Sequence, residues 1–151
     1  MDVKTVRILI AGLVASWVLV GNALAQDAHV AFLKSATGSV SVTRDQAQLP
    51  ATAGMQLLKR DTVVAGPGSA AGVVFVDGTV LAVGASSELE ISRYVFRPED
   101  NQYDFAVALK KGRAVYSSGR LAKMAPGSVQ VSTPRATVGV RGTRFIIDSE
   151  E

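Results

Sequence analysis

The sequence predicts an all-β fold, a single domain of short strands with a twisted solenoid-like or sandwich-like arrangement. Two observations lead to this prediction. Short segments alternate between apolar and polar residues with a period of two, which is typical of half-buried strands. Glycine and proline interrupt the chain at short intervals, so that no helix of normal length fits between them. The chain has no regular repeat, so the sequence leaves the choice between solenoid and sandwich open.

The N-terminal segment has the three parts of a secretory signal peptide. A short basic region precedes residues 8–21, which form an uncharged apolar run, and small residues follow up to Ala25. We therefore expect residues 1–25 to be a signal peptide that is cleaved before Gln26. The alternative is an uncleaved membrane anchor, but the run is shorter than the roughly 20 residues that cross a bilayer.

Residues 26–151 form the expected mature domain, with a β core over about 38–147. The domain has no cysteine, so its stability depends on its buried core and not on disulfides. The formal net charge of the chain is +3, which is too small to indicate a nucleic-acid partner. We expect a periplasmic protein that is not embedded in the membrane after cleavage, with secretion as the alternative.

Four segments alternate clearly enough to be predicted as half-buried strands: residues 38–43, 88–92, 104–109 and 128–132. Two further runs, residues 70–76 and 79–83, are apolar on both faces and predict a central hairpin that is covered on both sides. Asp77 and Gly78 lie between these runs and predict a two-residue turn with positive φ. The most polar stretch, residues 97–103, is predicted to be an exposed loop.

The residues that catalysis and metal binding require are scarce. His29 is the only histidine, it lies near the expected mature N-terminus, and no cysteine is present. One histidine without cysteine cannot supply the usual ligands of a zinc site, and it makes a poor basis for a hydrolytic triad. Glu88 and Glu90 share a strand face, where a solvated outer surface is a simpler interpretation than a calcium site. We therefore expect no catalytic residues, no metal and no cofactor.

The longest motif lies near the C-terminal end, where residues 133–145 read T-P-R-A-T-V-G-V-R-G-T-R-F. This pattern resembles the hallmark of the FecR-type domain, named after the iron-dicitrate regulator FecR protein. Its matching residues are Thr133, Pro134, Ala136, Gly139, Val140, Arg141, Gly142, Thr143 and Phe145. Shorter motifs of that family precede it in the expected order: Gly54, Leu57, residues 61–63 and 68–70, Phe75, residues 77–79, Gly84, Ser87, Leu89, Ile91, Leu109 and Gly112. The resemblance extends from about Gly38 to Ile147.

The resemblance implies an extracytoplasmic, β-rich module with a solenoid-like stack of short strands. In the regulators that give the family its name, this module belongs to a transmembrane anti-sigma factor that relays the loaded state of an outer-membrane receptor. Only seven residues precede the apolar run here, and the chain ends at Glu151. We therefore expect a stand-alone exported member without the sigma-binding and receptor-facing parts.

Two roles are open for the C-terminal motif, and we favour the structural one over ligand binding. Gly139 and Gly142 allow close backbone approach, while Val140 and Phe145 offer apolar anchors. The guanidinium of Arg141 has five donors, which can tie carbonyl groups or a carboxylate across a turn.

For the whole protein, the sequence favours a non-enzymatic binding or sensing module that interacts with an envelope protein or glycan. The alternatives are an enzyme that acts on envelope polymers and a structural protein that assembles through its sheet edges.

Overall fold

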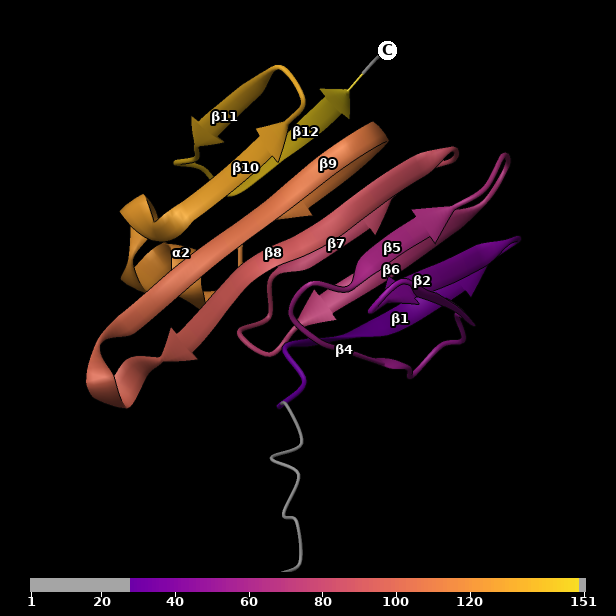
Figure 1. Cartoon of the computed structure of the whole chain (residues 1–151). Coiled ribbons are helices and arrows are strands. Elements are labelled where there is room, and N and C mark those ends of the chain that lie inside the picture. The colour runs from indigo at the N-terminus through magenta and orange to yellow at the C-terminus, as the bar shows by residue number, and fades with distance from the viewer. Residues whose placement is uncertain (1–27, 150–151) are drawn as a thin grey trace, which may run out of the picture.

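The computed structural model describes residues 28–149, which form one curled, mostly antiparallel sheet (Figure 1). The predicted signal peptide and its cleavage site between Ala25 and Gln26 lie outside the described residues. The strands are β1 (Ala31–Thr37), β2 (Val40–Arg44), β3 (Ala47–Pro50), β4 (Gln56–Leu57), β5 (Thr62–Ala65), β6 (Ala70–Phe75), β7 (Val80–Val83), β8 (Ser87–Arg97), β9 (Gln102–Ser117), β10 (Val129–Thr133), β11 (Ala136–Gly139) and β12 (Arg144–Ser149). The helical elements of this part are α2 (Arg120–Met124) and the 3-10 turns η1 (Pro98–Asp100) and η2 (Pro126–Ser128). None of the helices described is long and apolar enough to cross a membrane.

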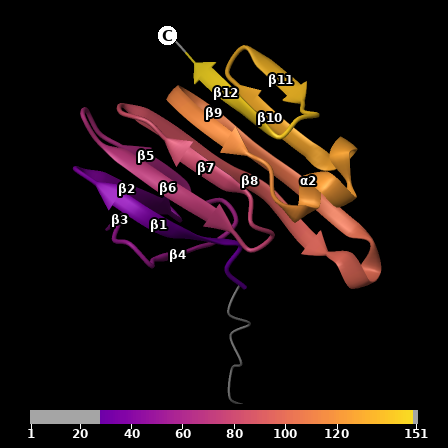
Figure 2. The same ribbon diagram turned by 180° about the vertical axis from the view of Figure 1, so that it is seen from behind.

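The sheet runs in the order β3-β2-β5-β8-β9-β7-β6-β1-β4, and the long strand β9 is where it turns back on itself. The first part of β9 pairs with β8 and, in parallel, with β10, whereas its last part pairs with β7 and β12. Gly112 lies between the two parts with a φ of +84°. A side chain at this position would overlap the hydroxyl of Ser87, so the bend in β9 requires glycine. Seen from behind in Figure 2, β10, β11 and β12 form one end of the curled sheet, and β1 to β4 form the other end.

The core lies inside the curl, where inward-facing apolar residues of the two halves of the sheet meet. Its centre is a group of four buried aromatic rings: Phe75, Tyr94, Phe105 and Tyr116. Neighbouring rings of this group have centroid distances between 4.9 and 5.9 Å, mostly with edge-to-face geometry. Aromatic rings bury large apolar areas, so this group links β6, β8 and β9 into one unit.

The prediction of a single all-β domain of short strands is confirmed. The predicted segments correspond to β2, β6, β7, β9, β10 and the first part of β8. The sequence did not indicate β1, whose alternation covers only a few residues. The buried core also includes Val30, Ala31 and Leu33, which precede the expected start of the core at about residue 38.

Asp77 and Gly78 lie in the turn between β6 and β7, but the turn differs from the expected two-residue form. The backbone N–H of Gly78 donates to the carbonyl of Phe75, and the N–H of Phe75 donates to the carbonyl of Thr79, both at 2.9 Å. Of Asp77 and Gly78, only Gly78 has a positive φ, of +86°. This is a three-residue loop that ends on a left-handed glycine.

A two-residue turn with positive φ at both positions does occur, between β2 and β3. Asp45 and Gln46 form it, with φ values of 48° and 66°. Glutamine in a left-handed conformation is strained, because its Cβ crowds the backbone. Sequence patterns missed this turn because it lacks the Asn-Gly or Asp-Gly signature.

Two further expectations need correction. The β6–β7 hairpin is not covered on both faces, because Ala70 and Ala82 are exposed and only alternate residues are buried. The expected exposed loop over residues 97–103 is shorter than predicted, since Arg97 ends β8 and Gln102 begins β9.

Candidate functional site

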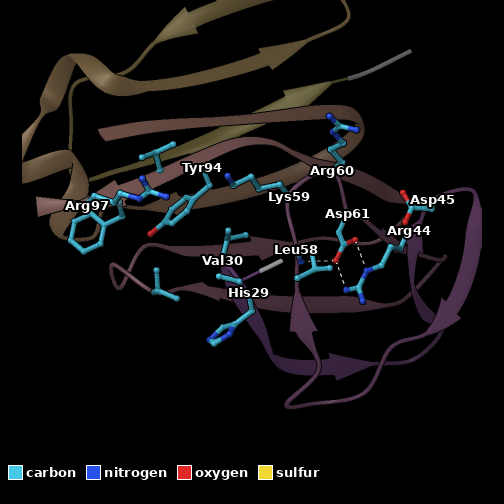
Figure 3. A pocket seen from close by; sticks show the side chains of 14 residues that line it. His29, Val30, Arg44, Asp45, Leu58, Lys59, Arg60, Asp61, Tyr94 and Arg97 are labelled. Atoms are coloured by element: carbon cyan, nitrogen blue, oxygen red, sulfur yellow. Dashed lines mark hydrogen bonds and ion pairs between the residues drawn. The ribbon is translucent and has the colours of Figure 1, made fainter. Parts of the chain in front are cut away.

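A cleft of about 680 Å³ opens between the C-terminal part of β8 and the loops that follow β2 and β4 (Figure 3). Its cationic lining consists of Arg44, Lys59, Arg60 and Arg97, with His29 as a further titratable group. Two carboxylates, Asp45 and Asp61, also line it, and Val30, Leu58, Val76, Tyr94 and Phe96 contribute apolar surface. We call this feature the basic cleft.

The buried carboxylate of Asp61 organises one side of the basic cleft. Arg44 binds it in a bidentate manner, with Nε 2.8 Å from Oδ1 and a terminal nitrogen 2.6 Å from Oδ2. The backbone N–H of Leu58 donates to Oδ2 at 2.7 Å. The hydrogen bond to Asp61 raises the pKa of Arg44 above its ordinary value. Asp61 is fully buried, and its pairing with Arg44 compensates its charge within the protein.

The turn that carries Lys59 and Arg60 is anchored on both sides. The N–H of Asp61 donates to the carbonyl of Leu58 at 3.3 Å, which closes the turn. The N–H of Arg60 donates to the carbonyl of Ile91 on β8, and the N–H of Ile91 donates back to Asp61. These backbone bonds fix the turn from which the side chains of Lys59 and Arg60 extend at the cleft.

Three cations of the basic cleft have no partner among residues 28–149. The side chains of Lys59, Arg60 and Arg97 are exposed and make no hydrogen bond or ion pair with another described residue. Figure 3 shows the labelled cations spread along the cleft, with Arg97 at one side and Arg44 and Arg60 at the other. Since Arg44 and Asp61 neutralise each other, the cleft has an excess of positive charge that suits an anionic ligand.

Behind the cleft, Tyr94 closes the core. Its hydroxyl donates to Asp77 at 2.8 Å and accepts a 3.1 Å hydrogen bond from the N–H of the same residue. Burial raises the pKa of the Tyr94 hydroxyl well above its usual range, and the charge of Asp77 adds to this effect. Tyr94 therefore stays protonated and holds the turn between β6 and β7.

The residues considered above for catalysis and metal binding lie at separate places in residues 28–149. No group of three or more His, Cys, Asp or Glu side chains lies together within this part of the chain. His29 is exposed at the rim of the basic cleft and has no hydrogen-bonded partner within residues 28–149. Glu88 and Glu90 lie on the outer face of β8, where Lys110 binds both, with its ammonium nitrogen 2.8 Å from Glu90.

The C-terminal motif lies away from the basic cleft, at the end of the sheet formed by β10, β11 and β12. Thr133 ends β10, Pro134 begins the turn after it, and β11 carries Ala136 and Gly139. The next four motif residues, Val140, Arg141, Gly142 and Thr143, connect β11 to β12, which contains Phe145. Most of these residues are exposed, and they border a hollow of about 530 Å³.

Within the motif, the structure shows the apolar contact of Phe145 but no hydrogen bond from the side chain of Arg141 to another described residue. The ring of Phe145 stacks on Tyr116 with centroids 4.6 Å apart, and the N–H of Val140 donates to the carbonyl of Val129 at 3.0 Å. Arg141 is exposed and its side chain makes no hydrogen bond to another described residue. A structural role for Phe145 thus has a visible contact, whereas that of Arg141 stays a prediction.

Sequence reasoning did not single out the basic cleft. Lys59 and Arg60 form one of only two adjacent basic pairs in the sequence, and this pair was the one local sign of a basic surface. Arg44 and Arg97 are separated from them along the chain and meet them only because β2 and β8 flank the same loop. The left-handed conformation of Arg60, with a φ of +70°, has no signature in the sequence.

The described residues form a single all-β domain with a basic cleft at one side. A family model described as FecR protein matches residues 61–151, which include β5 to β12. The chain therefore belongs to the FecR family, whose members are regulatory and sensing proteins associated with the cell envelope. The comparison with curated proteins and the comparison with solved structures each returned no match.

Proposed function

We propose that this protein is an exported, non-catalytic module of the cell envelope that binds an envelope protein and passes on or anchors that bound state. Membership of a regulatory and sensing family supports a binding role. The observation that carries the proposal is the basic cleft, in which the side chains of Lys59, Arg60 and Arg97 have no hydrogen-bond or ion-pair partner among residues 28–149. Cations on a rigid β scaffold are suited to recognition.

The proposal includes export by the predicted signal peptide. When the full chain is produced in a Gram-negative host, the product in the periplasmic fraction should begin at Gln26. Intact mass spectrometry of that fraction measures the N-terminus. A membrane-bound product that retains Met1 would contradict export with cleavage.

Crosslinking in intact cells tests the binding role. A photoreactive amino acid placed at Lys59 should capture a specific envelope protein, and the same amino acid at Lys34, on β1 away from the cleft lining, should not. Turnover assays on peptidoglycan and on generic ester and peptide substrates run alongside. Reproducible turnover that survives His29→Ala would contradict the non-catalytic proposal and favour the enzyme alternative.

A second candidate, self-assembly, is favoured by one specific observation. β11 and β12 are edge strands that carry exposed apolar residues, with Val138 55% and Ile146 67% exposed. Such edges can pair with another chain. Sedimentation of the purified protein would then show a mass that rises with concentration, and Ile146→Lys would abolish the rise.

A further inference from the structure

The edge of β8 that borders the basic cleft is open. β5 pairs with β8 only from Ser87 to Glu90, whereas β9 pairs with β8 as far as Arg97. From Arg93 to Arg97, the edge of β8 that faces away from β9 has no strand partner within residues 28–149. The segment with this open edge includes four residues that line the cleft: Tyr94, Val95, Phe96 and Arg97. The backbone N–H and C=O groups on this open edge thus lie next to Lys59, Arg60 and Arg97, the cations without a partner among residues 28–149.

We propose that the basic cleft receives an extended acidic polypeptide segment of the partner, which adds as a strand beside residues 93–97 of β8. This inference rests on the proposed function and specifies the partner's chemistry. An added strand gains main-chain hydrogen bonds from the open edge. Its acidic side chains meet Lys59, Arg60 and Arg97, while intervening apolar side chains cover Val76, which is 47% exposed, and Phe96. An anionic glycan would use the cations but not the strand edge, so the geometry favours a polypeptide.

The conformation of Arg60 is a second, independent observation. Arg60 has a φ of +70° at the third position of the turn that Leu58 and Asp61 close. This position suits glycine, since a Cβ in the left-handed region is strained. Unfavourable backbone conformations of this kind gather at binding sites, where the side chain is needed for function. The protein keeps an arginine here at the expense of stability.

The main test separates stability from binding. Arg60→Gly should raise the melting temperature by a few degrees because it relieves the strain. The same variant should weaken binding of a synthetic octapeptide of alternating glutamate and valine, measured by fluorescence anisotropy. Together with Lys59→Gln and Arg97→Gln, the loss should reach about tenfold, as expected for a few exposed charge pairs. Added salt should reduce the difference in peptide affinity between the unmodified protein and the triple variant.

Gln46→Gly is the matched control. It also replaces a strained non-glycine residue, in the β2–β3 turn, but Gln46 does not line the basic cleft. It should raise the melting temperature and leave peptide affinity unchanged. Unchanged affinity in the triple variant, or equal affinity for a lysine–valine peptide, would overturn the proposal.

Two N-methylated forms of the glutamate–valine peptide test the strand addition. A strand on an edge directs alternate N–H groups to its neighbour, so methylation of one alternate set should abolish binding and methylation of the other should not. Hydrogen exchange of residues 93–97 should slow when the unmodified peptide binds. If both methylated forms bind equally, or if an anionic polysaccharide binds and the peptide does not, strand addition is wrong. Specific crosslinks from Lys59 in cells would in that case still support the proposed function.

Discussion

The hydroxyl of Tyr94, on β8, donates a 2.8 Å hydrogen bond to the buried carboxylate of Asp77 in the turn between β6 and β7. The same carboxylate accepts hydrogen bonds from the hydroxyl of Thr79 at 2.7 Å and from the N–H of Leu121 at 3.1 Å. One side chain thus connects β8, the β6–β7 turn and α2. A buried carboxylate with several donors is stable, but the loss of one donor leaves it under-satisfied.

Tyr94→Phe should therefore lower the free energy of unfolding by about 1.5–3 kcal/mol, the usual value for a hydrogen bond to a charged group. Tyr116→Phe is the matched control, because the Tyr116 hydroxyl is buried without a hydrogen-bond partner among the described residues. It should change the free energy of unfolding by less than about 0.5 kcal/mol. Urea denaturation followed by circular dichroism measures both. Equal losses in the two variants would show that the bond to Asp77 contributes nothing specific.

Stability should also fall at alkaline pH. Burial raises the pKa of both Tyr94 and Tyr116, so the folded protein keeps two protons that the unfolded chain releases above about pH 10. This stabilisation is complete below pH 10 and is lost as the pH rises further. Tyr94, whose pKa is raised well above its usual range, contributes a slope of about 1.4 kcal/mol per pH unit, and Tyr116 acts in the same direction. The pKa of Lys110, raised by its hydrogen bond to Glu90, acts in the same direction.

Tyr94→Phe should reduce this slope between pH 10 and pH 12. The variant lacks the phenol of residue 94, so only Tyr116 still keeps a proton that the unfolded chain would release. Urea denaturation at a series of pH values measures the slope, and absorbance at 295 nm follows phenol ionisation. Ionisation of Tyr94 near pH 10 in protein that is still folded would contradict the prediction.

Gly119 should not tolerate a side chain. Its φ is −100°, so the reason is space and not backbone conformation. A methyl group there would overlap the backbone nitrogen of Thr79 and would lie 2.6 Å from the carboxylate of Asp77. Gly119→Ala should therefore cost about 1–3 kcal/mol of stability, as overpacking does. Gly127→Ala, where a methyl group meets nothing within 4 Å, is the control and should leave the melting temperature nearly unchanged.

Within the C-terminal motif, Phe145 and Arg141 should behave differently. Phe145→Ala removes the ring that stacks on Tyr116 and should lower the free energy of unfolding by about 2 kcal/mol. Arg141→Ala should change it by less than about 0.5 kcal/mol, because the side chain is exposed and makes no hydrogen bond to a described residue. Thermal unfolding measures both. A large loss of stability in Arg141→Ala would support the structural role that the motif suggested.

The sequence predicted the fold class and most strands because both depend on local patterns. Alternation over β2, β9 and β10 reports which face of each strand is buried, and glycine and proline mark where strands end. β1 escaped prediction because its alternation is short, although Leu33 is fully buried. The β6–β7 turn was located correctly, but its form was not, since Asp77 takes its conformation from contacts with Tyr94 and Leu121.

By itself, the sequence determined that the chain is an all-β domain with a FecR-type motif and a small net charge. Only the tertiary structure decided where charge accumulates and which backbone groups remain open. Arg44, Lys59 and Arg97 come from three separate segments, and the curl of the sheet brings them to one cleft. This cleft borders the end of β8, whose edge away from β9 has no strand partner among residues 28–149. The physical reason is that strand alternation is a local property, whereas the neighbours of a side chain depend on sheet register and curvature, which act between residues far apart in the chain.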